Sequence, residues 1–101
     1  LERAARTFPA HTAVVHGESR RYYRLLRDRC VRLAHALTRR GIGRGDTVAA
    51  LLPNIPAMLE CHYGVPMAGA VLNTLNTRLD AGTIAYCLDH GEAKIVVVDR
   101  E

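Results

Sequence analysis

The chain has 101 residues, of which 49% are hydrophobic and 24% charged, and it carries a formal net charge of +4. This length allows one compact domain with a single core and is too short for a typical two-substrate enzyme with its own lid. The charge is uneven, because residues 1–46 hold 11 Arg against 4 acidic residues and residues 47–101 hold 3 basic against 6 acidic residues. We interpret the arginines of the first half mainly as a solvated basic surface, and contact with phosphate groups is the alternative.

The sequence contains neither a secretory signal in its first 20 residues nor an apolar run near the roughly 20 residues of a membrane-spanning helix. Its three cysteines, Cys30, Cys61 and Cys87, are odd in number and widely separated, which argues against a disulfide framework or a zinc cluster. We therefore expect a cytoplasmic protein. Because the chain begins with Leu1 rather than Met, we also expect it to be a fragment of a longer protein.

The first part of the chain is predicted to form a helix, a hairpin and a second helix. A short helix over residues 1–8 stops before Pro9, and strands at residues 12–16 and 20–22 form an antiparallel hairpin. Residues 24–40 are predicted to form an amphipathic helix with a basic outer face. Its apolar stripe consists of Leu25, Leu26, Cys30, Leu33, Ala34 and Leu37. Gly41 is expected to end this helix in the left-handed conformation.

An uninterrupted apolar run over residues 47–52 predicts a strand that is buried on both faces of a parallel sheet. A helix is expected from Ile55 to about Met67, with Asn54 as its N-cap. Pro66 should kink or end this helix near its last turn. A second short strand is predicted over residues 70–73.

The last part of the chain is predicted to form a helix over residues 81–90 and a strand over residues 94–99. Asp80 can cap this helix and Gly91 can terminate it. Its buried stripe is expected to consist of Ile84, Cys87 and Leu88.

Together these elements predict an α/β fold with an N-terminal helix and β-hairpin, an amphipathic helix, and then a parallel βαβαβ unit. We expect residues 1–101 to be a single partial domain of a larger fold. A sheet cut from a larger one leaves an edge unpaired, and the apolar residues 95–98 are the predicted site of self-association.

Ligands of open parallel sheets bind beyond the carboxyl ends of the strands, which here are Pro53–Asn54, Asn73–Arg78 and Asp99–Glu101. The loop Asn73–Arg78 is the richest candidate, because it holds two Asn, two Thr and one Arg. Such side chains can bind a phosphate or an amide ligand. Alternatively, they hydrogen-bond within their own loop.

The sequence contains no recognisable catalytic constellation. Its five His residues lack the spacing of a helical zinc motif, so no metal site is expected. It has no serine in a nucleophile elbow and no glycine-rich loop that ends in Lys. Cys61 and His62 are adjacent, but neighbouring helix positions point in different directions, so we expect no catalytic role for the pair.

Four segments in this order resemble one known family. They are Arg21-Tyr22-Tyr23-Arg24-Leu25-Leu26, Gly41-Ile42-Gly43-Arg44-Gly45-Asp46-Thr47-Val48, Leu51-Leu52-Pro53-Asn54-Ile55-Pro56 and Val71-Leu72-Asn73-Thr74-Leu75-Asn76-Thr77-Arg78-Leu79. The chain is similar over nearly its whole length to the N-terminal region of ATP-dependent acyl-CoA synthetases, which are adenylate-forming, AMP-binding enzymes. One departure is Tyr23, which stands where relatives usually have a Ser or Thr that can cap the following helix.

The resemblance implies a parent enzyme that activates a carboxylic acid, foremost a fatty acid, with ATP and Mg and then transfers the acyl group to CoA. The family's phosphate loop, its Mg-supporting residues and its catalytic Lys all lie beyond residue 101. This segment is therefore expected to be scaffold without catalytic residues, inactive alone, with the rest of the enzyme as its partner. Only Arg78 matches a ligand position, because in some related ligases an Arg at this point approaches the nucleotide phosphate of CoA.

Two other interpretations, which do not make the chain part of an enzyme, stay open. The chain could be a free-standing basic α/β module that binds nucleic acid or a nucleotide through the helix at residues 24–40, or a non-catalytic assembly unit. We expect no nucleic acid partner, because the basic residues lack interleaved aromatic residues apart from Tyr22 and Tyr23.

Overall fold

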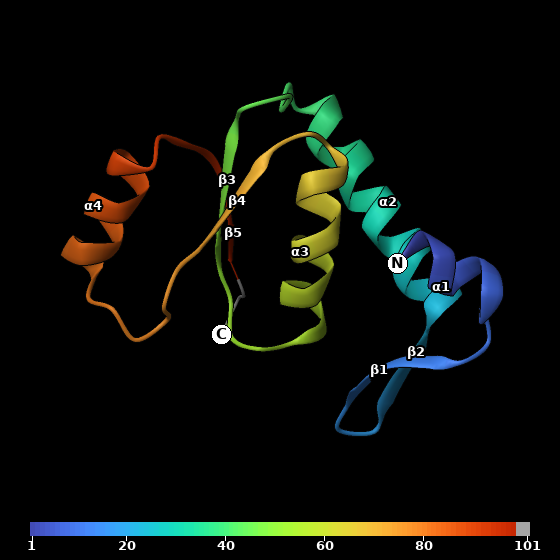
Figure 1. Ribbon diagram of the computed structural model, residues 1–101. Helices are drawn as coiled ribbons and strands as arrows, with labels where there is room; N and C mark the ends of the chain where they lie inside the picture. Colours follow the sequence, from blue (N-terminus) through green and yellow to red (C-terminus); the bar gives the residue numbers. More distant parts are fainter. Residues whose placement is uncertain (99–101) are drawn as a thin grey trace.

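The computed structural model describes residues 1–98, which form a β-hairpin, a three-stranded sheet and four helices (Figure 1). The elements follow the chain in the order α1 (Glu2–Thr7), β1 (Thr12–His16), β2 (Ser19–Tyr22), α2 (Tyr23–Arg39), β3 (Thr47–Leu51), α3 (Pro56–Met67), β4 (Val71–Thr74), α4 (Ala81–His90) and β5 (Ala93–Val98). The predicted order and type of every element are confirmed. The last predicted strand residue, Asp99, lies outside the described residues.

The hairpin β1–β2 is antiparallel, with Val15 opposite Arg20 and His16 opposite Ser19. Gly17 makes the turn at φ 60°, a conformation that costs glycine little because it has no Cβ. Figure 1 shows the hairpin projecting away from the three-stranded sheet, at the far end of α2. The sequence prediction of a hairpin in this segment is confirmed.

The long helix α2 forms without a side-chain cap at its start, as the tyrosines there predict. Its buried residues are Leu26, Cys30, Ala34 and Leu37. The prediction that Leu25 belongs to this stripe is wrong, since 43% of its surface is exposed. Leu25 lies about 100° around the helix from Leu26 and is therefore on the flank of the stripe. Gly41 follows α2 at φ 84°, which confirms the left-handed ending.

The helices α2 and α3 approach each other closely at Gly64. A Cβ at this position would lie 2.7 Å from Cδ2 of Leu33 and 3.0 Å from the carbonyl oxygen of Cys30. Only a residue without a side chain fits between the two helices here. The helix pair therefore depends on a glycine inside α3.

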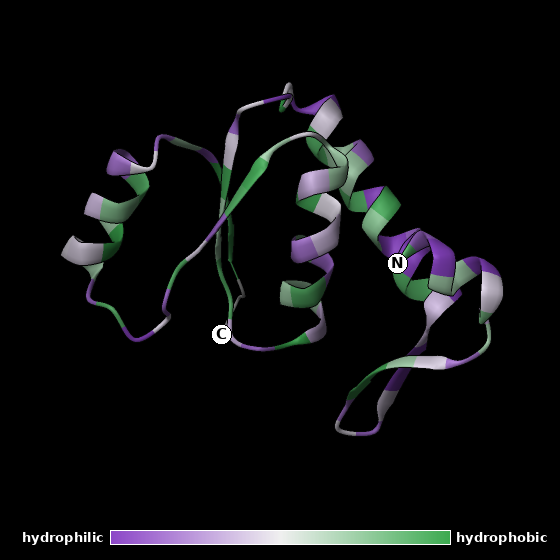
Figure 2. Cartoon of the chain, in the orientation of Figure 1, coloured by the Kyte–Doolittle hydropathy of each residue, from purple (hydrophilic) through white to green (hydrophobic). Residues whose placement is uncertain are grey.

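The sheet has the strand order β4-β3-β5 and is entirely parallel. The central strand is buried on both faces, because Val48, Ala49 and Ala50 have no exposed surface. Figure 1 shows α3 and α4 on opposite sides of the sheet, and Figure 2 shows hydrophobic residues along β3 and β5. The chain thus moves first to one side of β3 and then to the other, which confirms the parallel βαβαβ unit.

The start of α3 differs from the prediction. Ile55 is the N-cap residue, Pro56 is the first helical residue, and no side chain caps the helix. Ile55 is extended, at φ −115° and ψ 167°, because the ring of a following proline disfavours helical backbone for the residue before it. The helix therefore begins one residue later than predicted, and Asn54 does not cap it.

The helix α4 begins as predicted, because Oδ1 of Asp80 accepts a hydrogen bond of 2.6 Å from the backbone N–H of Thr83. Its expected buried stripe is only half-buried, and no residue of α4 is fully buried. The helix packs little against the other elements, so its apolar side chains stay partly exposed.

Gly91 ends α4 with φ −79° rather than in the left-handed conformation, which Glu92 adopts at φ 54°. Any residue can adopt this φ at position 91, so glycine is favoured there because a larger residue would lack space. A Cβ there would lie 3.0 Å from the carbonyl oxygen of Cys87 and 3.1 Å from Nδ2 of Asn73.

Candidate functional site

Two loops meet at the carboxyl edge of the sheet. Ala50 of β3 pairs with Thr74 of β4 in parallel register, so both strands end on the same side. The backbone N–H of Leu75 donates to the carbonyl oxygen of Ala50 at 2.9 Å, which holds the start of the second loop against β3. Both loops thus lie beyond the carboxyl ends of their strands, as predicted, while Asp99–Glu101 lies outside the described residues.

Between these loops lies a cavity of about 600 Å³. Leu52, Pro53 and Asn54 line it from the first loop, and Thr74, Leu75, Asn76 and Thr77 line it from the second. Met58 and His62 of α3 complete the wall.

The polar side chains of the cavity wall are hydrogen-bonding groups. The lining includes two amides, two hydroxyls and one imidazole, and none of the nine lining residues is a carboxylate, a lysine or a cysteine. Such groups can hold an uncharged polar ligand.

Arg78, the one residue that the sequence matched to a ligand role, follows the cavity loop without lining the cavity. Its backbone N–H donates to Oδ1 of Asn76 at 2.9 Å, so the Asn76 side chain bonds within its own loop. The Arg78 side chain is exposed. The interpretation that the loop side chains bond within their own loop is therefore confirmed for Asn76, while a ligand-binding role for Arg78 stays a prediction.

His62, like Met58, is a wall residue that the sequence alone did not assign to this cavity. Its Nδ1 lies 2.9 Å from the carbonyl oxygen of Met58, one helical turn earlier. Since a carbonyl oxygen only accepts, Nδ1 is the donor in this hydrogen bond. The sequence feature that could have indicated this wall is the four-residue spacing of Met58 and His62, because residues four apart lie on one face of a helix.

The Cys61–His62 pair is not a catalytic dyad. Cys61 is only 2% exposed, and burial raises the pKa of its thiol. His62 instead bonds to the backbone of its own helix. Burial likewise raises the pKa of the Cys30 thiol to about 11, so this thiol is not activated either.

Among residues 1–98, no group of three His, Cys, Asp or Glu side chains is arranged to hold a metal ion. None of the helices in the same range has the length and apolar character needed to cross a membrane.

Comparison with known proteins places the chain in a family. The model of the AMP-binding enzyme family matches residues 1–101. The chain therefore belongs to the AMP-binding enzyme family, as its sequence motifs predicted.

Two curated relatives match the whole chain. It is 52% identical over 101 residues to the peroxisomal acetate/butyrate–CoA ligase of Arabidopsis thaliana and 50% identical over 103 residues to an acetate–CoA ligase of Humulus lupulus. In each case the match covers 100% of this chain and 18% of the relative. The chain thus spans about a fifth of the length of these relatives.

A solved structure shares the fold. The fatty acyl CoA synthetase of Mycobacterium tuberculosis matches with a TM-score of 0.91 and 32% identity, over 96% of this chain and 20% of that one. The observed α/β arrangement is therefore the arrangement of one portion of a larger AMP-binding enzyme.

Proposed function

We propose that this chain is the N-terminal part of an acyl-CoA ligase, which joins a carboxylic acid to CoA through an acyl-adenylate at the expense of ATP. The observation that carries this proposal is the identity of about half of all residues, over the entire chain, to two proteins named as CoA ligases. The shared fold of a fatty acyl CoA synthetase supports it independently.

The substrate we propose is a carboxylic acid, without restriction to fatty acids. The two curated relatives are named for acetate and butyrate, and the structural neighbour for fatty acyl groups. The described residues include an uncharged polar cavity and no arginine or lysine in its wall. Selection of the acid is therefore assigned to the rest of the enzyme.

Apart from the CoA contact proposed below for Arg78, the role of residues 1–98 is structural support. The described residues lack a cluster that fits Mg, and the cavity wall has no cationic group that fits the phosphates of ATP. We assign both to the rest of the parent enzyme. Alone, the 101-residue chain should therefore have no turnover.

For CoA, we propose that Arg78 binds a phosphate of its nucleotide part. The exposed guanidinium stands next to the cavity loop and can offer two parallel hydrogen bonds to a phosphate. The cytoplasmic location and self-association of the isolated chain also stay predictions. The free state of all three cysteines is compatible with the first, and the exposed Val96 and Val98 on β5 support the second.

The test is the intact mass of the native protein together with its activity. We expect a product of several hundred residues that forms acyl-CoA from ATP, CoA and at least one acid in a panel of acetate, butyrate, benzoate and palmitate. The 101-residue chain, assayed in parallel, should form none. A native product of about 100 residues, or a full-length protein that adenylates no acid in the panel, would remove the ligase assignment.

A further inference from the structure

The side of α2 opposite its buried stripe carries a row of polar residues, which we call the basic row. Its members recur at steps of three and four residues and therefore share one side of the helix. They are Arg24, Asp28, Arg32, His35 and Arg39, and all but Asp28 are exposed. At a rise of about 1.5 Å per residue, the basic row is roughly 22 Å long.

The basic row has an unbalanced positive charge. Asp28 is its one acidic residue, and Oδ1 of Asp28 already accepts a hydrogen bond of 3.2 Å from Nη1 of Arg27. Within residues 1–98, the guanidinium groups of Arg24, Arg32 and Arg39 form no ion pair with a carboxylate. Three positive charges are thus available to an anionic partner.

This positive charge continues past the end of the helix. Arg40 and Arg44 are exposed, and neither pairs with a carboxylate in the described part of the chain. Figure 1 shows α2 beyond α3, on the side remote from the sheet. The basic row contains no apolar side chain, so packing it against an apolar core would bury unpaired charges. It is therefore a surface in a longer protein as well.

We propose that the basic row is a docking surface for an anionic phospholipid bilayer. Clusters of about four to eight basic residues on an amphipathic helix are typical of proteins that bind such membranes. Arginine suits phosphate headgroups, because its planar guanidinium can donate two parallel hydrogen bonds to a phosphate. A straight, convex helix face also matches a flat array of phosphates better than a ligand that must be enclosed. Binding of this kind occurs at the membrane surface.

Exposed aromatic side chains adjoin the start of the basic row. The carbonyl oxygen of Pro9 accepts a hydrogen bond of 3.2 Å from the backbone N–H of Arg24, so Phe8 lies near the first arginine of the row. Phe8 is 49% exposed and Tyr22 is 53% exposed. Aromatic rings are favoured at the boundary between headgroups and acyl chains. Single-stranded nucleic acid fits less well, because it needs stacking rings along the basic residues and the row itself has none.

The test measures binding of the native full-length protein to phospholipid vesicles by co-sedimentation. One set of vesicles is phosphatidylcholine alone and the other contains about 30% phosphatidylserine, at about 0.05 M and about 0.5 M salt. Arg24→Gln/Arg32→Gln removes two charges from the basic row. Arg20→Gln/Arg78→Gln is the matched control, because it removes two exposed arginines that lie outside α2. Binding of a labelled single-stranded RNA is measured at the same salt concentrations.

We expect the wild-type protein to bind the anionic vesicles at low salt, to dissociate from them at high salt, and to leave the neutral vesicles unbound. The row variant should bind roughly 25-fold more weakly, because each arginine near an anionic surface contributes about a factor of five. The control variant should lose much less binding, since its arginines lie away from the row.

Three results would overturn the inference. They are absence of binding to anionic vesicles at low salt, equal binding to both kinds of vesicle, and equal weakening by the two double variants. Tight binding of the RNA without binding of vesicles would overturn it too, because the partner would then be nucleic acid. Vesicle binding is measured without ATP, CoA or acid, so its outcome is independent of the proposed ligase reaction.

Discussion

Nε of Arg29 on α2 lies 2.7 Å from Oε2 of Glu60 on α3, and the guanidinium of Arg21 on β2 bonds to the same oxygen. Glu60 is 7% exposed and is the one buried charged residue among residues 1–98. Its carboxylate raises the pKa of Arg29, mainly through their hydrogen bond. One carboxylate thus joins three elements that are distant in the sequence.

We expect Glu60→Gln to destabilise the protein by about 1–3 kcal/mol, because two arginines lose a charged acceptor. The loss should stay in this range because the Arg29 side chain is 44% exposed and can turn to solvent. Urea unfolding measures it. Glu18→Gln in the exposed hairpin turn is the control and should change the unfolding free energy little.

Gly64→Ala should destabilise the α2–α3 pair by about 1–3 kcal/mol, because the added methyl group overpacks a tight contact. The new Cβ would lie 2.7 Å from Cδ2 of Leu33. Gly82→Ala in α4 is the matched control, since its Cβ would meet only Oδ1 of Asp80 at 3.7 Å. That variant should be neutral or more stable by up to about 1 kcal/mol. Equal thermal shifts for the two variants would contradict this account of the close approach.

Asp80 should contribute stability that depends on pH. The backbone N–H of Thr83, and secondarily its hydroxyl, lower the pKa of the Asp80 carboxyl, so the folded state favours the charged form. This contribution is present above the unfolded pKa of about 3.9 and is lost as the pH falls through the lower folded value. The stability difference between wild type and Asp80→Ala, followed by urea unfolding, should therefore shrink between pH 6 and pH 2. A difference that is constant over this range would contradict a role for the charge.

Arg78→Ala in the full-length enzyme should raise the KM for CoA by roughly tenfold or more, because a hydrogen bond to a charged group contributes about 1.5–3 kcal/mol. Acyl-adenylate formation, measured by exchange of pyrophosphate into ATP, should be nearly unchanged. Arg39→Ala, another exposed arginine, is the control. An equal loss in both half-reactions would discard the proposed contact with CoA.

Most element boundaries could be read from the sequence, because the signals are local. Asp80 followed by an apolar periodic segment marks a helix start, and an apolar run such as Thr47–Leu51 marks a buried strand. The start of α3 was placed wrongly because Asn54 gave a cap signal, whereas the proline at position 56 had the stronger steric effect.

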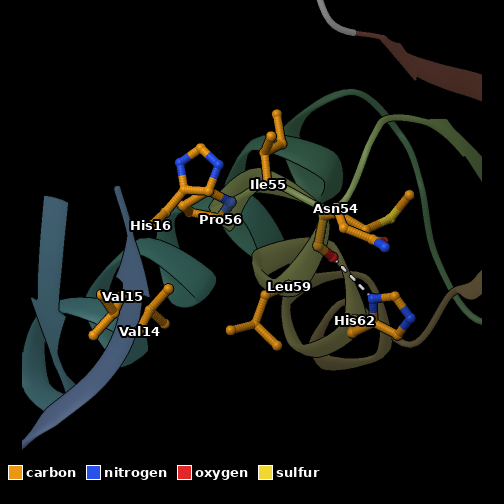
Figure 3. Close-up of a pocket in the computed structure, with 9 residues that line it drawn as sticks. Val14, Val15, His16, Asn54, Ile55, Pro56, Leu59 and His62 are labelled. Atoms are coloured by element: carbon orange, nitrogen blue, oxygen red, sulfur yellow. Dashed lines mark hydrogen bonds between the residues drawn. The ribbon is translucent and has the colours of Figure 1, made fainter. Parts of the chain in front are cut away.

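The candidate site was predicted only in part. The sequence placed Asn54, Thr74 and Asn76 in loops at the carboxyl ends of parallel strands, but that they line one cavity is seen only in the structure (Figure 3 shows Asn54 and His62 of this wall). The wall formed by His62 did not follow, because its position depends on how α3 rotates against the sheet. The same holds for Glu60, whose two arginine partners lie 39 and 31 residues away in the chain.

The sequence by itself determined the order of helices and strands, the parallel βαβαβ unit, and the family through its four ordered motifs, because these depend on periodicity, turn residues and local caps. Only the tertiary structure decided which side chains meet across elements, namely the two arginines on Glu60 and the helix contact at Gly64. These contacts depend on the rotation and separation of packed elements, which the spacing of residues along the chain does not specify.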